Sequence, residues 1–393
     1  MKKRLLFLGV IVLVSFTVIL LRENVMLKSK INIGTGNIEK VQQKDMLSMM
    51  LETDAGSGNY ELTTRDSWPT EGYIFNSTLS KCENGGELSW DDENKRVLMS
   101  GNVSDKCYVY FDLDNKITLA NYIISQYNGV QGNNNIYYHD NSLENGAGDN
   151  SYRYAGSSET TNNFVCFGSD EAICPEDNLY RIIGVFEGQV KLIKAYQAKK
   201  NLLGNNGDYD TQDNYYWNRS SGTANWDESN LNKINLNINF LTNLDEKWQN
   251  MIVFTNWHID KNILSNNQLP NAIFKQEIVN STNTYNAKVA LMYLSDFVFA
   301  ISPSEWDSSY NSNKNDENWL FINTSFSEWM ITNYNSGVAY FFGSGTICFE
   351  CNGPTKNSFV YDYSYYVRPV FFLNKDIKYN SGLGSIDNPI RLS

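Results

Sequence analysis

The sequence has few histidines, prolines and basic residues. Among 393 residues there are 2 histidines, 7 prolines and 32 lysines and arginines, against 44 acids, and the net charge is −12. Binding to nucleic-acid phosphates requires clustered Lys and Arg, and the one basic block is Lys2-Lys3-Arg4. The composition therefore argues against a nucleic acid as a partner. His139 and His258 have no spacing typical of a Ser/His/Asp hydrolase, and no carboxylate pair stands out, so an enzyme is the less favoured class.

The longest uncharged apolar run is at the start of the chain. Residues 5–21 follow the basic block and contain no charge. A helix of this length spans roughly 25 Å, close to the ~30 Å hydrocarbon core of a membrane. The positive flank predicts a cytoplasmic N-terminus and an exported remainder. No small-residue cleavage pattern follows, so residues 1–23 are expected to form an uncleaved single-pass anchor in the cell membrane, with a cleaved signal peptide as the alternative.

The six cysteines fall into three couples that are local in sequence. An even number in an exported chain indicates disulfides, and strand-like sequence flanks each couple. The expected pairs are Cys82–Cys107, Cys166–Cys174 and Cys348–Cys351. The motif "CFEC" that contains Cys348 and Cys351 is also compatible with a redox dithiol or a zinc site. A disulfide across a turn is favoured because its flanks read as strand, turn and strand, and no further metal ligands lie nearby.

The chain divides by composition into successive segments. After the anchor, residues 24–69 read as a stalk with a helix near residues 45–52 and a Gly/Ser/Thr/Pro-rich linker. Residues 70–113 are typical of a small β module with a central hairpin. Residues 114–178 are expected to contain a helix, a long polar connection and a disulfide hairpin. Residues 179–393 are expected to form a larger mixed domain.

The larger segment begins with the clearest hairpin of the sequence. "LYRIIGVFEGQVKLI", residues 179–193, joins two β-branched runs through a short turn. Two helix signals and several late strands follow, and the last apolar run is "FVYDYSYYVRPVFFL", residues 359–373. Because a terminal strand needs a partner, we expect it to lie beside the first hairpin. Pro369 is expected at an edge or bulge, and Arg368 is expected to reach a carboxylate or carbonyl groups.

These blocks resemble an uncharacterised domain family of exported proteins from low-GC Gram-positive gut bacteria. The blocks that carry the resemblance are "LYRIIGVFEGQVKLI", "NWDESNLNKINLNINFL", "VALMYLSDFVFA", "EWMIT" and "YYVRPVFFL". The layout is similar to the C-type-lectin-like fold shared with formylglycine-generating enzymes. The resemblance implies a C-type-lectin-like domain with paired first and last strands. Together with the expected anchor and β module, this gives an α+β chain with an N-terminal transmembrane helix, a small β module and the C-type-lectin-like domain. It implies no single activity.

Tyrosines and asparagines of the late strands are the candidate ligand residues. In a lectin-like fold these strands carry the ligand face, and Tyr and Asn combine rigid contact area with adaptable hydrogen bonds. The candidates are Tyr334, Asn335, Tyr361, Tyr363 and Tyr365. Alternation places the last three on one face of a strand, which is either a ligand face or part of the core.

Three carboxylates offer a candidate calcium site. Asp208, Asp210 and Asp213 have a spacing that suits Ca²⁺, which binds six to eight oxygens. The pattern lacks the later Gly and Glu of an EF-hand loop, so a solvated loop is favoured and no cofactor is assigned.

The sequence as a whole predicts a membrane-anchored extracellular adhesion protein that recognises a glycan or a surface protein. Two alternatives stay open: an extracellular redox protein or other enzyme that uses Cys348 and Cys351, and a structural envelope protein.

Overall fold

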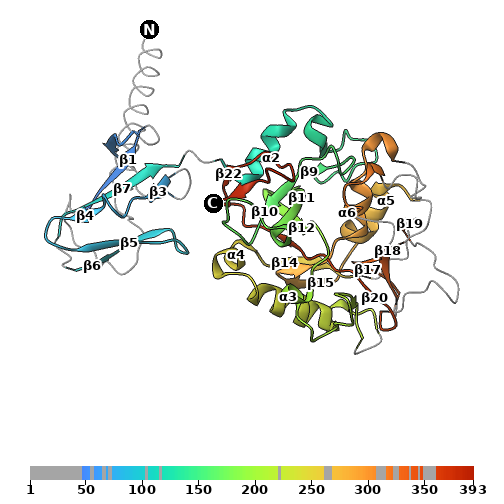
Figure 1. Cartoon of the computed structure of the whole chain (residues 1–393). Coiled ribbons are helices and arrows are strands. Elements are labelled where there is room, and N and C mark those ends of the chain that lie inside the picture. Colours follow the sequence, from blue (N-terminus) through green and yellow to red (C-terminus); the bar gives the residue numbers. More distant parts are fainter. Residues whose placement is uncertain are drawn as a thin grey trace, which may run out of the picture. The chain divides into compact units, whose positions relative to one another are not determined.

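The structure is a computed structural model, and it shows two compact units. It describes residues 47–53, 57–63, 68–69, 73–101, 105–114, 117–219, 223–260, 268–306, 316–321, 327–335, 338–343, 346–347 and 360–393. The first unit is Met1–Asn115 and the second is Lys116–Ser393. The fold is mixed α+β, with mostly strands and few helices (Figure 1).

The expected membrane-spanning helix is not among the helices that the structure describes. Residues 5–21 lie outside the described residues. None of the described helices is long and apolar enough to cross a membrane. The longest of them, η4 (Leu231–Phe240), has 10 residues, whereas a transmembrane helix needs about 20. The expected fold class is therefore corrected: the described residues form a mixed α+β fold, and none of their helices supports the N-terminal transmembrane helix.

The first unit is built on a small mixed sheet. Its strand order is β2–β1–β7–β3, and β4 also pairs with β7. The strands are β1 (Leu47–Glu52), β2 (Tyr60–Leu62), β3 (Tyr73–Phe75), β4 (Lys81–Cys82) and β7 (Cys107–Leu113). The predicted hairpin is confirmed as β5 (Glu87–Asp91) and β6 (Arg96–Ser100), which pair antiparallel.

The helix predicted near residues 45–52 is wrong, because residues 47–52 form strand β1. This strand runs parallel to β7, with Met49 opposite Val109. Leu47, Met49 and Leu51 pack on a small core that includes Val109 and Phe111. Residues two apart share one face of a strand, so the non-local partner β7 overrides the local helical spacing.

The second unit contains a seven-stranded sheet. Its order is β16–β21–β12–β11–β9–β8, and β10 also pairs with β11. The strands are β8 (Ile136–His139), β9 (Ser151–Tyr154), β10 (Phe164–Cys166), β11 (Leu179–Phe186), β12 (Gln189–Lys194), β16 (Val289–Ala290) and β21 (Val370–Phe372). The helices include α2 (Leu119–Tyr127), α3 (Lys200–Leu203), α4 (Glu246–Met251), α5 (Pro270–Phe274), η5 (Lys275–Val279) and α6 (Leu294–Phe299). Figure 1 shows β9, β10, β11 and β12 near the middle of this unit.

The predicted hairpin is confirmed as β11–β12, and the predicted pairing of the last apolar strand with it is confirmed for β21. Glu187 and Gly188 both have positive φ at the turn, as a tight hairpin turn requires. The last apolar strand lies beside this hairpin, with Val370 of β21 opposite Ile193 of its second strand, β12. The C-terminal part of the chain therefore closes the sheet that the hairpin opens.

The single long strand expected over residues 359–373 is divided in the structure. It forms β20 (Ser364–Tyr365) and β21 (Val370–Phe372), which belong to different sheets. Pro369 lies in the break and has no N–H for a ladder. The buried Arg368 side chain donates from Nε and Nη2 to the two carboxylate oxygens of Glu328, at 2.7 and 2.8 Å. The predicted carboxylate partner of Arg368 is thus present, and it is at the start of β17 (Glu328–Asn335).

Candidate functional site

Two sequence-distant candidates meet at one short sheet of the second unit. Strand β13 (Tyr215–Tyr216) pairs antiparallel with β20, with Tyr216 opposite Ser364. Around this pair lies a group that we call the tyrosine surface: Tyr216, Arg219, Tyr361, Tyr363 and Tyr365. The Asp-rich loop, residues 208–213, therefore lies beside the tyrosine run, residues 361–365. More than a hundred residues separate the two in the sequence.

Hydrogen bonds beyond the strand pair hold the two segments in place. The Ser364 hydroxyl donates to Oδ2 of Asp210 at 2.7 Å. The backbone N–H of Asn218 donates to the carbonyl of Val360 at 2.9 Å. Below the surface, the buried indole of Trp329 donates from Nε1 to the carbonyl of Tyr215 at 2.8 Å. These contacts give the exposed tyrosines a fixed support.

The predicted tyrosines divide between surface and core. Tyr361 and Tyr363 are 37% and 38% exposed. Tyr365 is half-buried and packs on Trp329, with ring centroids 4.6 Å apart. The rings of Tyr363 and Tyr365 lie 6.2 Å apart at an interplanar angle of 18°. The sequence left open whether this face was core or ligand face, and the structure shows one tyrosine packed and two exposed.

Both signs of charge accompany the exposed rings. The Arg219 guanidinium lies over the ring of Tyr216, 4.5 Å from its centroid. Burial first, and then the negative charge of Asp210, raise the pKa of Tyr216, with a smaller contribution from Asp362. A hydrogen bond with Asp210 also contributes to this rise, and the hydroxyl is protonated at neutral pH, as that of an ordinary tyrosine is. The surface offers ring faces, a guanidinium, carboxylates and hydroxyls within one area.

The three carboxylates considered for calcium bind protein groups instead. The buried Asp208 accepts from the backbone N–H of Arg219 at 3.1 Å and of Leu231 at 2.9 Å. Asp210 accepts from Ser364, as described above, and Asp213 accepts from the backbone N–H of Lys200 at 2.7 Å. In the part of the chain that the structure describes, they do not form a group with ligand atoms within 4.8 Å of one another. Their role here is to fix loops and helix starts.

Several predicted residues cannot be placed in this site. Tyr334 and Asn335 are at the end of β17, paired with β18 (Val338–Gly343). Cys348 and Cys351 lie outside the described residues. The redox hypothesis for that motif stays a prediction.

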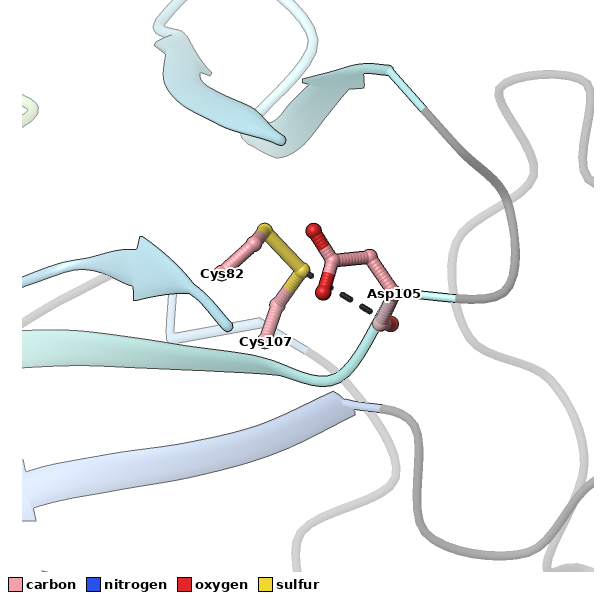
Figure 2. Close-up of side chains that lie close together, drawn as sticks. All are labelled: Cys82, Asp105 and Cys107. Atoms are coloured by element: carbon pink, nitrogen blue, oxygen red, sulfur yellow. Dashed lines mark hydrogen bonds between the residues drawn. A yellow bond between two sulfur atoms is a disulfide. The ribbon is translucent and has the colours of Figure 1, made fainter. Parts of the chain in front are cut away.

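The other two predicted disulfides are confirmed. Cys82 bonds to Cys107 and Cys166 bonds to Cys174. Figure 2 shows the first pair beside Asp105, whose carboxylate lies next to the sulfurs. Asp105 accepts from the backbone N–H of Asn84 at 2.8 Å and of Gly86 at 3.0 Å.

These three side chains are the one group of potential metal ligands found among the described residues. Both sulfurs are bonded to each other, so neither is available as a thiolate ligand. Burial opposes ionisation of Asp105, but the hydrogen bonds from Gly86 and Asn84 outweigh it and lower its pKa. A Cβ on Gly86 would lie 3.1 Å from the Asp105 carboxylate and from Sγ of Cys82. The group is thus a disulfide cross-link of the small unit that packs closely against a carboxylate, and it is not a metal centre.

Removing the Cys82–Cys107 disulfide should destabilise the first unit selectively. The bond joins residues 25 apart, and the loop-entropy model gives about 3 kcal/mol for such a loop. A variant with Cys82→Ser and Cys107→Ser should lose amide protection in residues 47–114 at low denaturant concentration, as measured by hydrogen exchange. The matched control, Cys166→Ser with Cys174→Ser, removes a bond between residues 8 apart and should leave the protection of residues 47–114 unchanged. Equal protection of that segment in both variants would contradict the stabilising role.

The sequence analysis missed part of the site. Tyr216 and Arg219 were not proposed as ligand residues, and Asp210 was considered for calcium alone. The available signal was the aromatic run "NYYW" directly after the Asp-rich loop, which reads as a short strand. No pattern in the sequence indicated that this strand pairs with residues 364–365.

No protein-family model, curated protein or solved structure matches this chain. The resemblance described from the sequence therefore stays a prediction. The functional argument depends on the geometry of the chain itself.

Proposed function

We propose that this chain is an exported binding protein that recognises a glycan through its tyrosine surface. The observation that carries the proposal is the pair of exposed rings, Tyr361 and Tyr363. They lie on the segment whose Ser364 bonds to Asp210 and pairs with Tyr216, the residue under the Arg219 guanidinium. Tyrosine supplies large contact area with little loss of side-chain freedom on binding. A sugar presents apolar C–H faces to such rings and hydroxyl groups to neighbouring carboxylates and guanidinium groups.

The disulfides support export. Disulfides form and persist in oxidising environments such as the outside of the cell. The chain contains two of them among its described residues. The net charge of −12 is compatible with neutral and amino-bearing surface polymers and disfavours polyanionic ones.

A screen of immobilised glycans, mucins and peptidoglycan fragments tests the proposal. The wild-type chain should bind a defined glycan, and replacing Tyr361 and Tyr363 together with alanine should weaken that binding by about tenfold or more. Aromatic contacts are worth about 0.5–1.5 kcal/mol each beyond their buried area, and about 1.4 kcal/mol corresponds to a factor of ten. The Tyr363→Phe variant keeps the ring and should retain most of the affinity.

The chain offers a matched control for this screen. Phe254 is an exposed aromatic residue outside the tyrosine surface, at 66% exposure, so Phe254→Ala should bind as the wild type does. Equal loss in Phe254→Ala and in the double tyrosine variant would indicate a nonspecific effect. If the chain bound mucin protein but none of the glycans, the ligand would be a protein and the glycan proposal would be wrong.

A further inference from the structure

A second site is indicated by a cavity of about 550 Å³ beside the Cys166–Cys174 disulfide. One wall is the hairpin tip, residues 169–174, and the other is the C-terminal segment, residues 380–392. The buried Trp248, from α4, also lines the cavity. The volume is within the range of about 300–1,000 Å³ that is typical of small-ligand sites. No residue of the tyrosine surface lines this cavity.

The charges that line the cavity include both signs. Glu171 and Asp387 are carboxylates, and Arg391 supplies a guanidinium. Among the ion pairs of the described residues, none joins any of these three to an opposite charge, whereas Asp170, which also lines the cavity, pairs with Lys247 at 2.7 Å. Opposite charges thus line one cavity without forming an ion pair with each other.

The guanidinium has one hydrogen bond to the opposite wall. Nη2 of Arg391 donates to the backbone carbonyl of Ala172 at 2.9 Å, which ties the C-terminal wall to the hairpin tip. The remaining N–H groups of Arg391 have no hydrogen-bond acceptor among the described residues. A guanidinium with several such donors binds a carboxylate in a bidentate manner.

Apolar and amide groups complete the cavity. Ile173 is 86% exposed and Ile386 is 47% exposed, and both belong to its lining. Asn380 and Asn388 contribute amide groups. Exposed aliphatic side chains beside unpaired charges suit a ligand that is itself charged at both signs and carries an apolar group.

We propose that this cavity binds an amino acid or a short peptide with free amino and carboxyl groups. Arg391 receives the carboxylate, Glu171 and Asp387 receive the ammonium group, and Ile173 and Ile386 contact an apolar side chain. The proposal is independent of the tyrosine surface, because it uses none of its residues.

Calorimetric titration of the full-length chain with leucyl-leucine tests this site. The dipeptide should bind, and blocking either end, as N-acetyl-leucyl-leucine or as leucyl-leucine amide, should weaken binding by about tenfold or more, since each block removes one charge-assisted contact. Arg391→Gln should weaken binding of the free dipeptide by about tenfold. The same variant should bind leucyl-leucine amide about as weakly as the wild type does. Arg96→Gln changes an arginine of the first unit and should leave the affinity unchanged.

Arg391→Gln also removes the hydrogen bond to Ala172, so weaker binding in that variant has two explanations: a lost contact with the ligand or a displaced cavity wall. A second variant distinguishes them. Asp387→Asn should reduce the preference for the free dipeptide over its N-acetyl form while the amide-to-free ratio stays as in the wild type. Three results would overturn the proposal: no heat of binding with the dipeptide up to about 10 mM, equal affinity for free and blocked dipeptides, or unchanged ratios in both variants.

Discussion

Replacing Arg368 with methionine is expected to lower the free energy of unfolding of the second unit by about 3–5 kcal/mol, the usual cost of removing one partner of a buried ion pair. Arg368 is 1% exposed. It donates to both oxygens of Glu328 and, from Nη2, to the carbonyl of Leu320 at 2.8 Å. The variant leaves the Glu328 carboxylate buried without its counter-ion. Urea unfolding followed by tryptophan fluorescence measures the loss.

The loss should depend on pH in a defined direction. Burial raises the pKa of Glu328, and the charge of Arg368 counteracts part of that rise. Without Arg368 the pKa rises further, so the folded state binds more protons than the unfolded state over a wider pH range. Stability then falls as the pH rises through that range, and Arg368→Met should be less destabilised at about pH 5 than at about pH 8.

A surface arginine provides the control for this experiment. Arg219→Gln changes an exposed side chain, and such changes usually alter stability by no more than about 0.5 kcal/mol. A destabilisation of Arg368→Met as small as that of Arg219→Gln, or one that is the same at both pH values, would contradict the account of the Arg368–Glu328 pair.

Breaking the Lys191–Asp296 pair is expected to cost a similar amount. Nζ of Lys191 lies 2.5 Å from Oδ2 of Asp296, and the two side chains are 3% and 2% exposed. The ammonium also lies 4.8 Å from the ring centroid of Tyr293 and 5.5 Å from that of Phe372. Lys191→Met should lower the free energy of unfolding by about 3–5 kcal/mol, because the Asp296 side chain then remains buried without its ion-pair partner.

The double replacement distinguishes this pair from a simple packing effect. Lys191→Met combined with Asp296→Leu should recover most of the loss, since two apolar side chains bury no unpaired charge. A double-mutant cycle then gives a coupling energy between the two positions. Full additivity of the two single losses would contradict the pairing.

The pH dependence of Asp296→Asn should have the opposite sign to that of Arg368→Met. Burial lowers the pKa of Lys191, and the charge of Asp296 opposes this shift. Without Asp296 the pKa falls further, so the folded state binds fewer protons than the unfolded state and stability rises with pH.

The exposed pair Lys199–Asp177, with side chains 54% and 49% exposed, is the matched control for Lys191→Met. Lys199→Met should lower the free energy of unfolding by less than about 1 kcal/mol.

Most of the features predicted correctly from the sequence are local ones. The hairpins β5–β6 and β11–β12 each combine alternating residues with a tight turn. The two confirmed disulfides join cysteines 25 and 8 residues apart. One longer-range expectation, the late strand beside the first hairpin, is also confirmed, because an apolar terminal strand needs a partner.

The features that the sequence could not predict depend on distant partners. Strand β1 has helical spacing of apolar residues and becomes a strand because β7 pairs with it. Tyr365 is packed and Tyr363 is exposed because Trp329 lies under the first of them. The cavity beside the Cys166–Cys174 disulfide is lined by hairpin and C-terminal residues more than 200 positions apart. No local pattern in the sequence indicates that such segments meet.

The most direct test of the proposed function is hydrogen exchange of the chain with and without the strongest glycan from the screen. The account predicts slower exchange in residues 208–219 and 360–366, which carry the tyrosine surface, and unchanged exchange in residues 169–174. Protection confined to other segments, or a screen with no glycan that binds, would contradict the claim that this surface recognises a glycan.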